Sequence, residues 1–167
     1  MNTIGSAASS FAKSIQGLGT SDALLRIEER IKIETNQDML FELMLMKAQC
    51  HAGLGEREKA IQLLRKLDQT SNRTNIPYFL AEMLIQNGEY KDAIAKLTST
   101  IDRSSDMNEN WFVSTARLLR SYCAAKIGSF DLAKLDLEVV EEDEEIFWLS
   151  INPPITKQRI REMIAMK

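Results

Sequence analysis

A glycine followed five residues later by an alanine occurs three times in this chain, and this repeat constrains the fold more than any other feature. The copies are Gly55 with Ala60, Gly88 with Ala93, and Gly128 with Ala133. The first two glycines are 33 residues apart and the last two are 40 apart. A leucine follows each alanine by four residues, and a small residue precedes each glycine by seven. Internal repeats of this length are typical of stacked arrays of one supersecondary unit.

Each unit is expected to be a helix, a glycine-centred turn and a second helix. Glycine adopts the left-handed conformation that ends a helix at little cost, because it has no β-carbon. The alanine lets the second helix approach the first closely. The second helices have apolar residues at helical spacing: Ile61, Leu64 and Leu67; Ile94, Leu97 and Ile101; and Leu132, Leu135, Val139 and Val140. The units are predicted at about 38–71, 74–105 and 111–145.

The middle unit carries the most complete pattern, with Leu80, Ala81, Leu84, Gly88, Tyr90, Ala93 and Leu97. Residues 38–141 resemble the tetratricopeptide repeat (TPR) family, whose unit is about 34 residues long. The chain departs from that pattern where an aromatic residue normally opens the first helix, since Met44, Pro77 and Arg117 stand there, and it lacks the closing proline. The resemblance implies an all-α fold, a right-handed α-solenoid of stacked helical hairpins.

The ends of the chain are expected to cover this array. Residues 1–20 are predicted to be a flexible segment, and residues 21–167 a single helical domain that begins with a capping helix over 22–35. Asn152 and two following prolines interrupt the chain before a C-terminal capping helix at 155–166. Solenoid ends need such covers, because an open terminal repeat exposes an apolar face.

Charge is unevenly placed near the C-terminus. Residues 131–145 carry one lysine against eight acidic residues, whereas the last helix carries Lys157, Arg159, Arg161 and Lys167 against Glu162. One hypothesis is that the basic helix folds back beside the acidic stretch. The alternative is two independently solvated charged faces.

The composition argues against catalysis and metal binding. The formal net charge is −3, and the chain has one histidine, His51, and two cysteines, Cys50 and Cys123. These are too few for the usual zinc clusters, and no phosphate-binding glycine loop or nucleophile elbow is present. We therefore expect a non-catalytic protein without cofactor or metal. His51 and both cysteines are expected to have packing or surface roles.

The sequence also limits the cellular location of the protein and the classes of partner that it can bind. No apolar stretch is long enough to span a membrane, and the N-terminal residues lack the apolar core of a secretory signal. The basic residues form no stripe interleaved with aromatic residues, as a nucleic-acid site would need. We expect a cytoplasmic protein that binds neither membranes nor nucleic acid.

The candidate site is a groove, because stacked hairpins curve and their first helices line the concave side. The helical period, counted ten, six and three residues back from each glycine, predicts groove positions at Leu45, Gln49 and Ala52, then Tyr78, Glu82 and Ile85, then Leu118, Tyr122 and Ala125. Glu42 is assigned to the same groove. Tyrosine is enriched where binding energy concentrates. The expected ligand is a peptide with apolar anchors and basic residues that meet Glu42 and Glu82. The alternative is that the terminal helices cover one or both tyrosines. Aromatic pairs at 111–112 and 147–148 are expected to plug the core.

Three functions fit these features. The first is a non-catalytic adaptor or chaperone-like module that binds a partner protein in its groove. The second is a self-associating scaffold, a homodimer held by its terminal helices or by residues 39–46. The third is a small bacterial secretion chaperone or an immunity-type protein, since the length and the three-unit plan are similar to those of that group.

Overall fold

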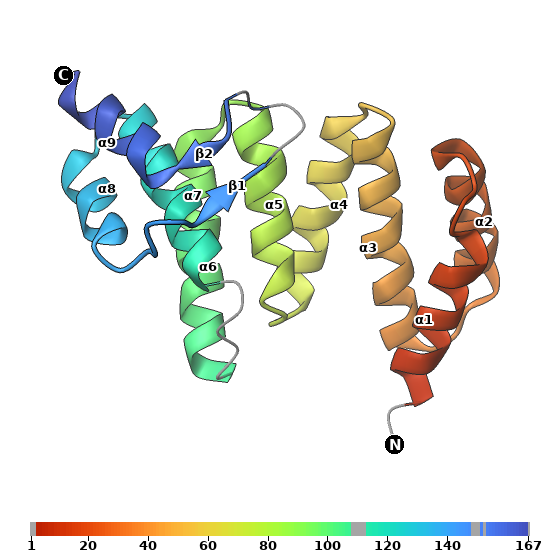
Figure 1. Ribbon diagram of the computed structural model, residues 1–167. Helices are drawn as coiled ribbons and strands as arrows, with labels where there is room; N and C mark the ends of the chain where they lie inside the picture. The colour runs from red at the N-terminus through yellow and green to blue at the C-terminus, as the bar shows by residue number, and fades with distance from the viewer. Residues whose placement is uncertain (1–2, 108–112, 148–150, 152, 167) are drawn as a thin grey trace. The chain divides into compact units, whose positions relative to one another are not determined.

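The computed structural model describes residues 3–107, 113–147, 151 and 153–166. Its elements are α1 (Thr3–Ile15), α2 (Thr20–Ile33), α3 (Gln37–Gly53), α4 (Arg57–Thr70), α5 (Asn75–Gln86), α6 (Tyr90–Met107), α7 (Val113–Lys126), α8 (Phe130–Leu137), β1 (Glu145–Ile146), β2 (Ile155–Thr156) and α9 (Lys157–Ala165). The all-α expectation is confirmed (Figure 1). The short strands β1 and β2 were not predicted.

The three repeat glycines end their helices with left-handed backbone: φ is +78° at Gly55, +79° at Gly88 and +80° at Gly128. After α3, the N–H of Glu56 donates to the carbonyl of His51 at 2.9 Å, and the N–H of Gly55 donates to the carbonyl one residue further on at 3.0 Å. The same pair of hydrogen bonds closes α5 and α7. This Schellman arrangement satisfies carbonyls that the helix end would leave unpaired. It joins α3 to α4, α5 to α6 and α7 to α8 as hairpins, and the three repeat alanines are fully buried.

The chain divides into two compact units, residues 1–70 and 71–167. The first contains α1 to α4, and the second contains α5 to α9 with both strands. This division differs from the single helical domain expected over residues 21–167. The first predicted repeat belongs with the N-terminal helices, and the other two repeats belong with the C-terminal residues.

The N-terminal unit contains a helix, α1, where the sequence led us to expect a flexible segment over residues 1–20. Ala8 of α1 is 7% exposed and shares an apolar cluster with α2 and with Leu43 of α3, which is fully buried. Phe11 and Ile15 pack against the same cluster. Positions 8, 11 and 15 lie on one helical face. That face is short and stands among serines and alanines, so the pattern is weak in sequence.

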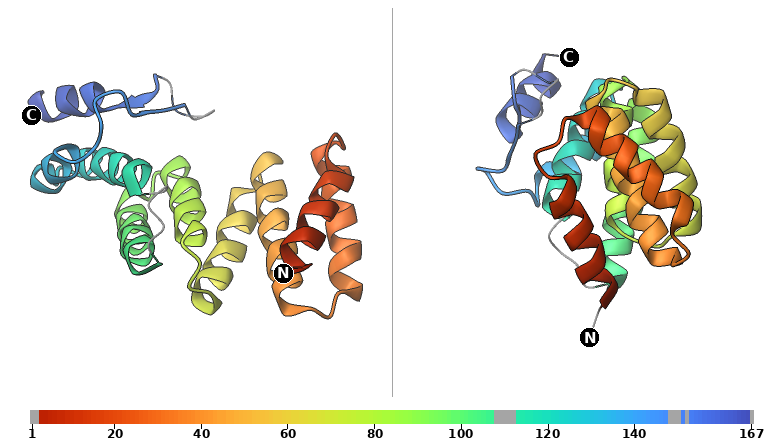
Figure 2. Two further views of the ribbon diagram at one scale, coloured as in Figure 1. Left: turned by 60° about the horizontal axis from the view of Figure 1, so that its bottom comes forward. Right: turned by 90° about the vertical axis from the view of Figure 1, so that its right-hand side faces the viewer.

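The C-terminal unit folds its last residues back onto its own helices. After α8 the chain forms β1, which pairs antiparallel with β2, placing Glu145 opposite Thr156 and Ile146 opposite Ile155. Both β2 and α9 contact α7, and α9 also contacts α8 (Figure 2). Residues 153–166, which include β2 and α9, are called the C-terminal segment below.

The predicted aromatic core plugs are only partly within the described chain. Phe147 is 73% exposed, so its assignment to the core was wrong. Its neighbour Trp148 and the pair at 111–112 lie outside the described residues.

Candidate interaction surface

In the N-terminal unit, the predicted groove positions lie on α3. Gln49 is exposed and Glu42 is half-buried, whereas Leu45 is only 6% exposed. The face that these positions offer is therefore mainly polar. Leu45 contributes to the core of its unit.

In the C-terminal unit, the structure buries most of the predicted groove positions. Leu118 is fully buried, and Ile85 is 2%, Tyr122 3% and Tyr78 7% exposed, whereas Glu82 is half-buried. These side chains therefore do not line an accessible groove together. The helical period placed each residue on a face of its own helix, but it carried no information about what packs on that face.

Tyr78 and Glu82, one turn apart on α5, form a hydrogen-bonded pair in which the phenol donates to the carboxylate. Burial raises the pKa of Glu82 to about 7, although the hydrogen bond from Tyr78 opposes the shift. Burial and the nearby carboxylates of Glu82 and Glu144 raise the pKa of Tyr78. Glu144 accepts hydrogen bonds from Thr115 at 2.9 Å and from Ser114 at 3.2 Å, both on α7. This cluster therefore links α5, α7 and the chain just before β1.

Three side chains contact the ring of Tyr122 on α7. Its ring meets that of Tyr90 edge-on, with centroids 6.2 Å apart. The ammonium of Lys126 lies 5.4 Å from the ring centroid, and the guanidinium of Arg159 on α9 lies 5.6 Å from it. A cation over an aromatic face is attracted by the ring quadrupole. The interpretation that a terminal helix covers this tyrosine is therefore correct.

Ionic contacts attach the C-terminal segment to the end of the acidic stretch. Glu142 accepts two hydrogen bonds from Arg161, at 2.8 and 2.9 Å, and pairs with Lys157 at 2.9 Å. These partners, Arg161 first, lower the pKa of Glu142 to about 2. Lys157 is 5% exposed and also donates to the carbonyl of Val140 at 2.7 Å. The docking of the basic helix beside the acidic stretch is confirmed, and the alternative of two independently solvated faces is wrong.

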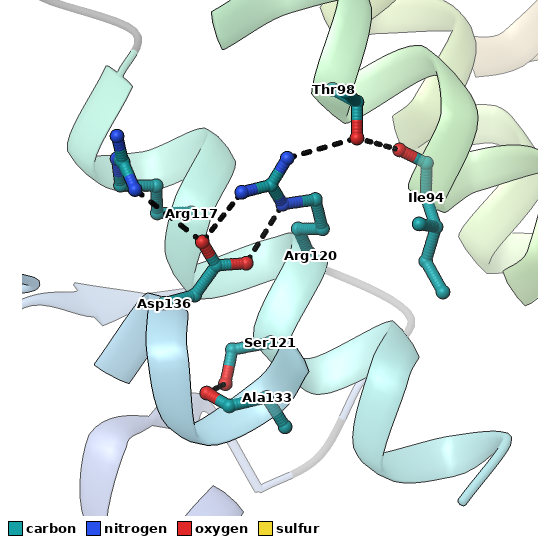
Figure 3. Close-up of polar contacts among 7 residues, drawn as sticks. All are labelled: Ile94, Thr98, Arg117, Arg120, Ser121, Ala133 and Asp136. Atoms are coloured by element: carbon teal, nitrogen blue, oxygen red, sulfur yellow. Dashed lines mark hydrogen bonds and ion pairs between the residues drawn. The ribbon is translucent and has the colours of Figure 1, made fainter. Parts of the chain in front are cut away.

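Helix α8 carries a buried acid that the sequence analysis missed. Leu135 is 58% and Val139 59% exposed, so their predicted place on the apolar face was wrong. Asp136 is fully buried instead, with a two-pronged hydrogen bond from Arg120 at 2.7 and 2.8 Å and Arg117 at 3.5 Å (Figure 3).

The same network extends to a third helix. Arg120 also donates to the hydroxyl of Thr98 on α6 at 2.9 Å, so one guanidinium connects α6, α7 and α8 (Figure 3). Asp136 is tolerated inside the unit because its charge is paired and its oxygens accept hydrogen bonds. A charged residue amid apolar neighbours on α8, with two arginines on the preceding helix, was the available signal.

An open hollow of about 540 Å³ lies between α8 and α9. Its lining mixes apolar and charged side chains: Lys134, Leu137, Glu138, Glu142, Lys157, Arg161, Ile164 and Ala165. Helix α9 thus contacts α7 closely but leaves space against α8.

His51, Cys50 and Cys123, the residues considered above for catalysis or metal binding, are all buried or half-buried. His51 is 6% exposed, and its Nδ1 lies 2.5 Å from the carboxylate of Glu56. Cys50 and Cys123 are free thiols; Cys50 is half-buried and Cys123 is fully buried. Burial raises the pKa of both thiols, that of Cys123 to about 12.

The described residues contain neither a cluster of metal ligands nor a membrane-spanning helix. Among them, no group of three or more His, Cys, Asp and Glu side chains is placed to hold a metal ion. In the same part of the chain, no helix combines the length and apolar character needed to cross a membrane.

Helical hairpins closed by glycine turns and packed through buried alanines define the class of TPR-type helical repeats. The model of the family described as "Anaphase-promoting complex, cyclosome, subunit 3" matches residues 22–100, from α2 into α6. Over these residues, just under half of the chain, the protein is similar to the TPR-type repeat family, a generally non-catalytic group whose folds serve in protein–protein interaction. No curated protein and no solved structure matches the chain significantly.

Proposed function

We propose that this protein is a non-catalytic adaptor or chaperone-like module that binds a segment of a partner protein on the inner faces of its repeat helices. The observation that carries the proposal is the C-terminal segment on α7. There a repeat helix already holds a stretch of polypeptide: β2 and α9 pack against α7, and Arg159 lies over the ring of Tyr122. The family matched by residues 22–100 is named for a subunit of a multiprotein complex, which supports a role in assembly.

A cytoplasmic location is part of this proposal. It is supported by the two free thiols, since cysteines stay reduced in the cytosol. A homodimer is the alternative that the sequence analysis raised, and the solution mass distinguishes it from a partner-binding monomer.

Site-specific photo-crosslinking tests the binding face. A photoreactive phenylalanine replaces Gln49, which is exposed at a predicted groove position of α3, or Gln62, which is exposed on α4. After irradiation in a native lysate, we expect a discrete protein adduct from position 49 and none from position 62. Adducts of equal yield at both positions, or at 62 alone, would contradict binding on the inner face.

A further inference from the structure

We propose that the C-terminal segment is a built-in occupant of a peptide site formed by α7 and the residues that follow α8, and that a partner segment of like chemistry displaces it. That partner segment presents an apolar side chain flanked by arginine and lysine. This inference rests on the proposed function and names both the partner chemistry and the regulation of one binding face.

The receiving face selects cations at three places. The ring of Tyr122 lies under the guanidinium of Arg159, at 5.6 Å. The carboxylate of Glu142 accepts the two cations Lys157 and Arg161. The carbonyl of Val140 accepts a further hydrogen bond from Lys157. An acidic or neutral segment would leave this carboxylate and carbonyl without their donors.

Apolar contacts supply the rest of the recognition. Ile155 in β2 and Ile160 in α9 are both fully buried. Lys157, Arg159 and Arg161 lie close to these isoleucines in sequence, so the segment brings both buried apolar side chains and cations to the surface beneath it. A ligand for this face needs both kinds of side chain at similar spacing.

The attachment has the features of a replaceable ligand. The side chain of Glu142 is 68% exposed and that of Arg161 is 47% exposed, so their pairing is screened by salt. The β1–β2 ladder is two residues long on each side, and α9 has nine residues, too few for an isolated stable helix. The open hollow of about 540 Å³ between α8 and α9 lies directly beside the segment.

The cations lie on the C-terminal segment, and their acceptors lie on the face beneath it. Each side of the contact can therefore be altered separately. The test uses the full chain and a fluorescent peptide with the sequence of residues 153–166. Binding is measured by anisotropy to the intact chain and to an Arg159→Gln/Arg161→Gln variant. That variant weakens the resident segment and leaves Tyr122 and Glu142 in place.

We expect the peptide to bind the variant about tenfold more tightly than the intact chain, because apparent affinity falls with the fraction of molecules whose site is open. A peptide with the same two glutamines should bind the variant about tenfold more weakly than the native peptide. The charge-matched control Arg26→Gln/Lys32→Gln alters two exposed cations of α2 and should bind like the intact chain. Equal weak binding of the native peptide to all three proteins overturns the proposal.

Amide hydrogen exchange of the intact chain gives a second test that does not depend on a variant. We expect the amides of α9 to exchange through local opening, faster than those of α7 and α8. Exchange of α9 only together with α7, by global unfolding, overturns the proposal. A concentration-dependent dimer in which α9 is exchanged between chains would assign the face to a second copy, and it overturns the proposal too.

Failure here is distinguishable from failure of the proposed function. An adduct at position 49 without peptide exchange leaves partner binding intact and refutes the occupied site. Peptide exchange without any adduct supports the site on α7 and refutes binding on α3.

Discussion

In each unit, a segment from one end of the chain packs on a repeat helix, and the two units differ in how this packing is held. In the N-terminal unit, α1 packs on α3 through Ala8, Phe11 and Ile15, and its one charged residue in the described range, Lys13, is exposed. In the C-terminal unit, the C-terminal segment lies on α7 with one buried isoleucine in β2, one in α9, and a set of cations that meet Tyr122 and Glu142. The first cover depends on apolar burial, which salt scarcely changes. The second depends also on charge, so ionic strength and pH can weaken it.

The parts of the core nearest α1 and α8 differ in the same sense. The cluster around Leu43 in the N-terminal unit is apolar. The C-terminal unit encloses Asp136 with Arg120 and the hydroxyl of Thr98. A buried ion pair contributes less net stability than an apolar contact of the same size, but removing one partner strands the other charge. The comparison therefore predicts which substitutions harm each unit.

The largest effect is expected from Asp136→Ala, which leaves the guanidinium of Arg120 without its carboxylate. Breaking such a pair costs about 3–5 kcal/mol. Urea unfolding followed by tryptophan fluorescence measures it, since both tryptophans fall within residues 71–167. The control Glu138→Ala removes an exposed acid next to α8 and should change the midpoint little. Equal midpoints for the two variants would show that the C-terminal unit does not depend on its buried charge.

Leu43→Ala is expected to cost the N-terminal unit about 3 kcal/mol, since it removes a fully buried side chain from the α1–α2–α3 cluster. Thermal unfolding by circular dichroism measures the loss. Amide exchange of α1 should rise in parallel. The control Leu25→Ala truncates a side chain that is 60% exposed on α2, and its effect should be under about 0.5 kcal/mol. If α1 stays as protected in Leu43→Ala as in the intact chain, its docking does not depend on this cluster.

Glu82 predicts a pH dependence of the C-terminal unit. Its pKa is raised from 4.5 to about 7 in the folded state, so folding favours the protonated form. This contribution is fully present below pH 4.5, and it is lost as the pH rises through about 7. From the size of the shift we expect a loss of about 1–3 kcal/mol between those limits. In Glu82→Gln the fluorescence-detected stability should lose this slope, and an unchanged slope would assign it to another group.

The smallest effect is expected from Glu142→Gln, which removes the acceptor shared by Lys157 and Arg161. Amide exchange of α9 should rise at low salt, and the difference from the intact chain should shrink at high salt. The lowered pKa of Glu142, about 2, keeps its contribution present above pH 4.5 and removes it as the pH falls through about 2. Exchange of α1 should be insensitive to salt in both proteins. A salt effect on α1 as large as that on α9 would erase the contrast between the two covers.

The repeat determined what could be predicted from the sequence. The hairpins and their glycine turns follow from local rules, because left-handed backbone and close helix approach restrict the residue at each position. The docking of the basic C-terminal helix could also be predicted, since clusters of opposite charge identify two surfaces that attract each other. Helix α1 was not predicted, because its apolar face consists of few side chains.

The burial of individual side chains depended on partners distant in sequence. The orientation of α8 depends on Asp136, whose partner Arg120 is 16 residues away, so apolar spacing alone placed Leu135 and Val139 on the wrong side. Most of the predicted groove positions in the C-terminal unit are buried for the same reason, whereas Gln49 on α3 is exposed. Arg159 of the C-terminal segment lies over the ring of Tyr122, and no local pattern encodes that return.

The two cysteines give each unit a natural chemical label. Cys50 and Cys123 lie five residues before their repeat glycines, at equivalent places in different units, and both are free. Alkylating reagents react with the thiolate, which the raised pKa of each thiol suppresses in the folded state. Half-buried Cys50 should be alkylated first, whereas buried Cys123 should react only after its unit opens. The mass of each labelled peptide, followed over time, would then report the opening of both units in one unmodified sample.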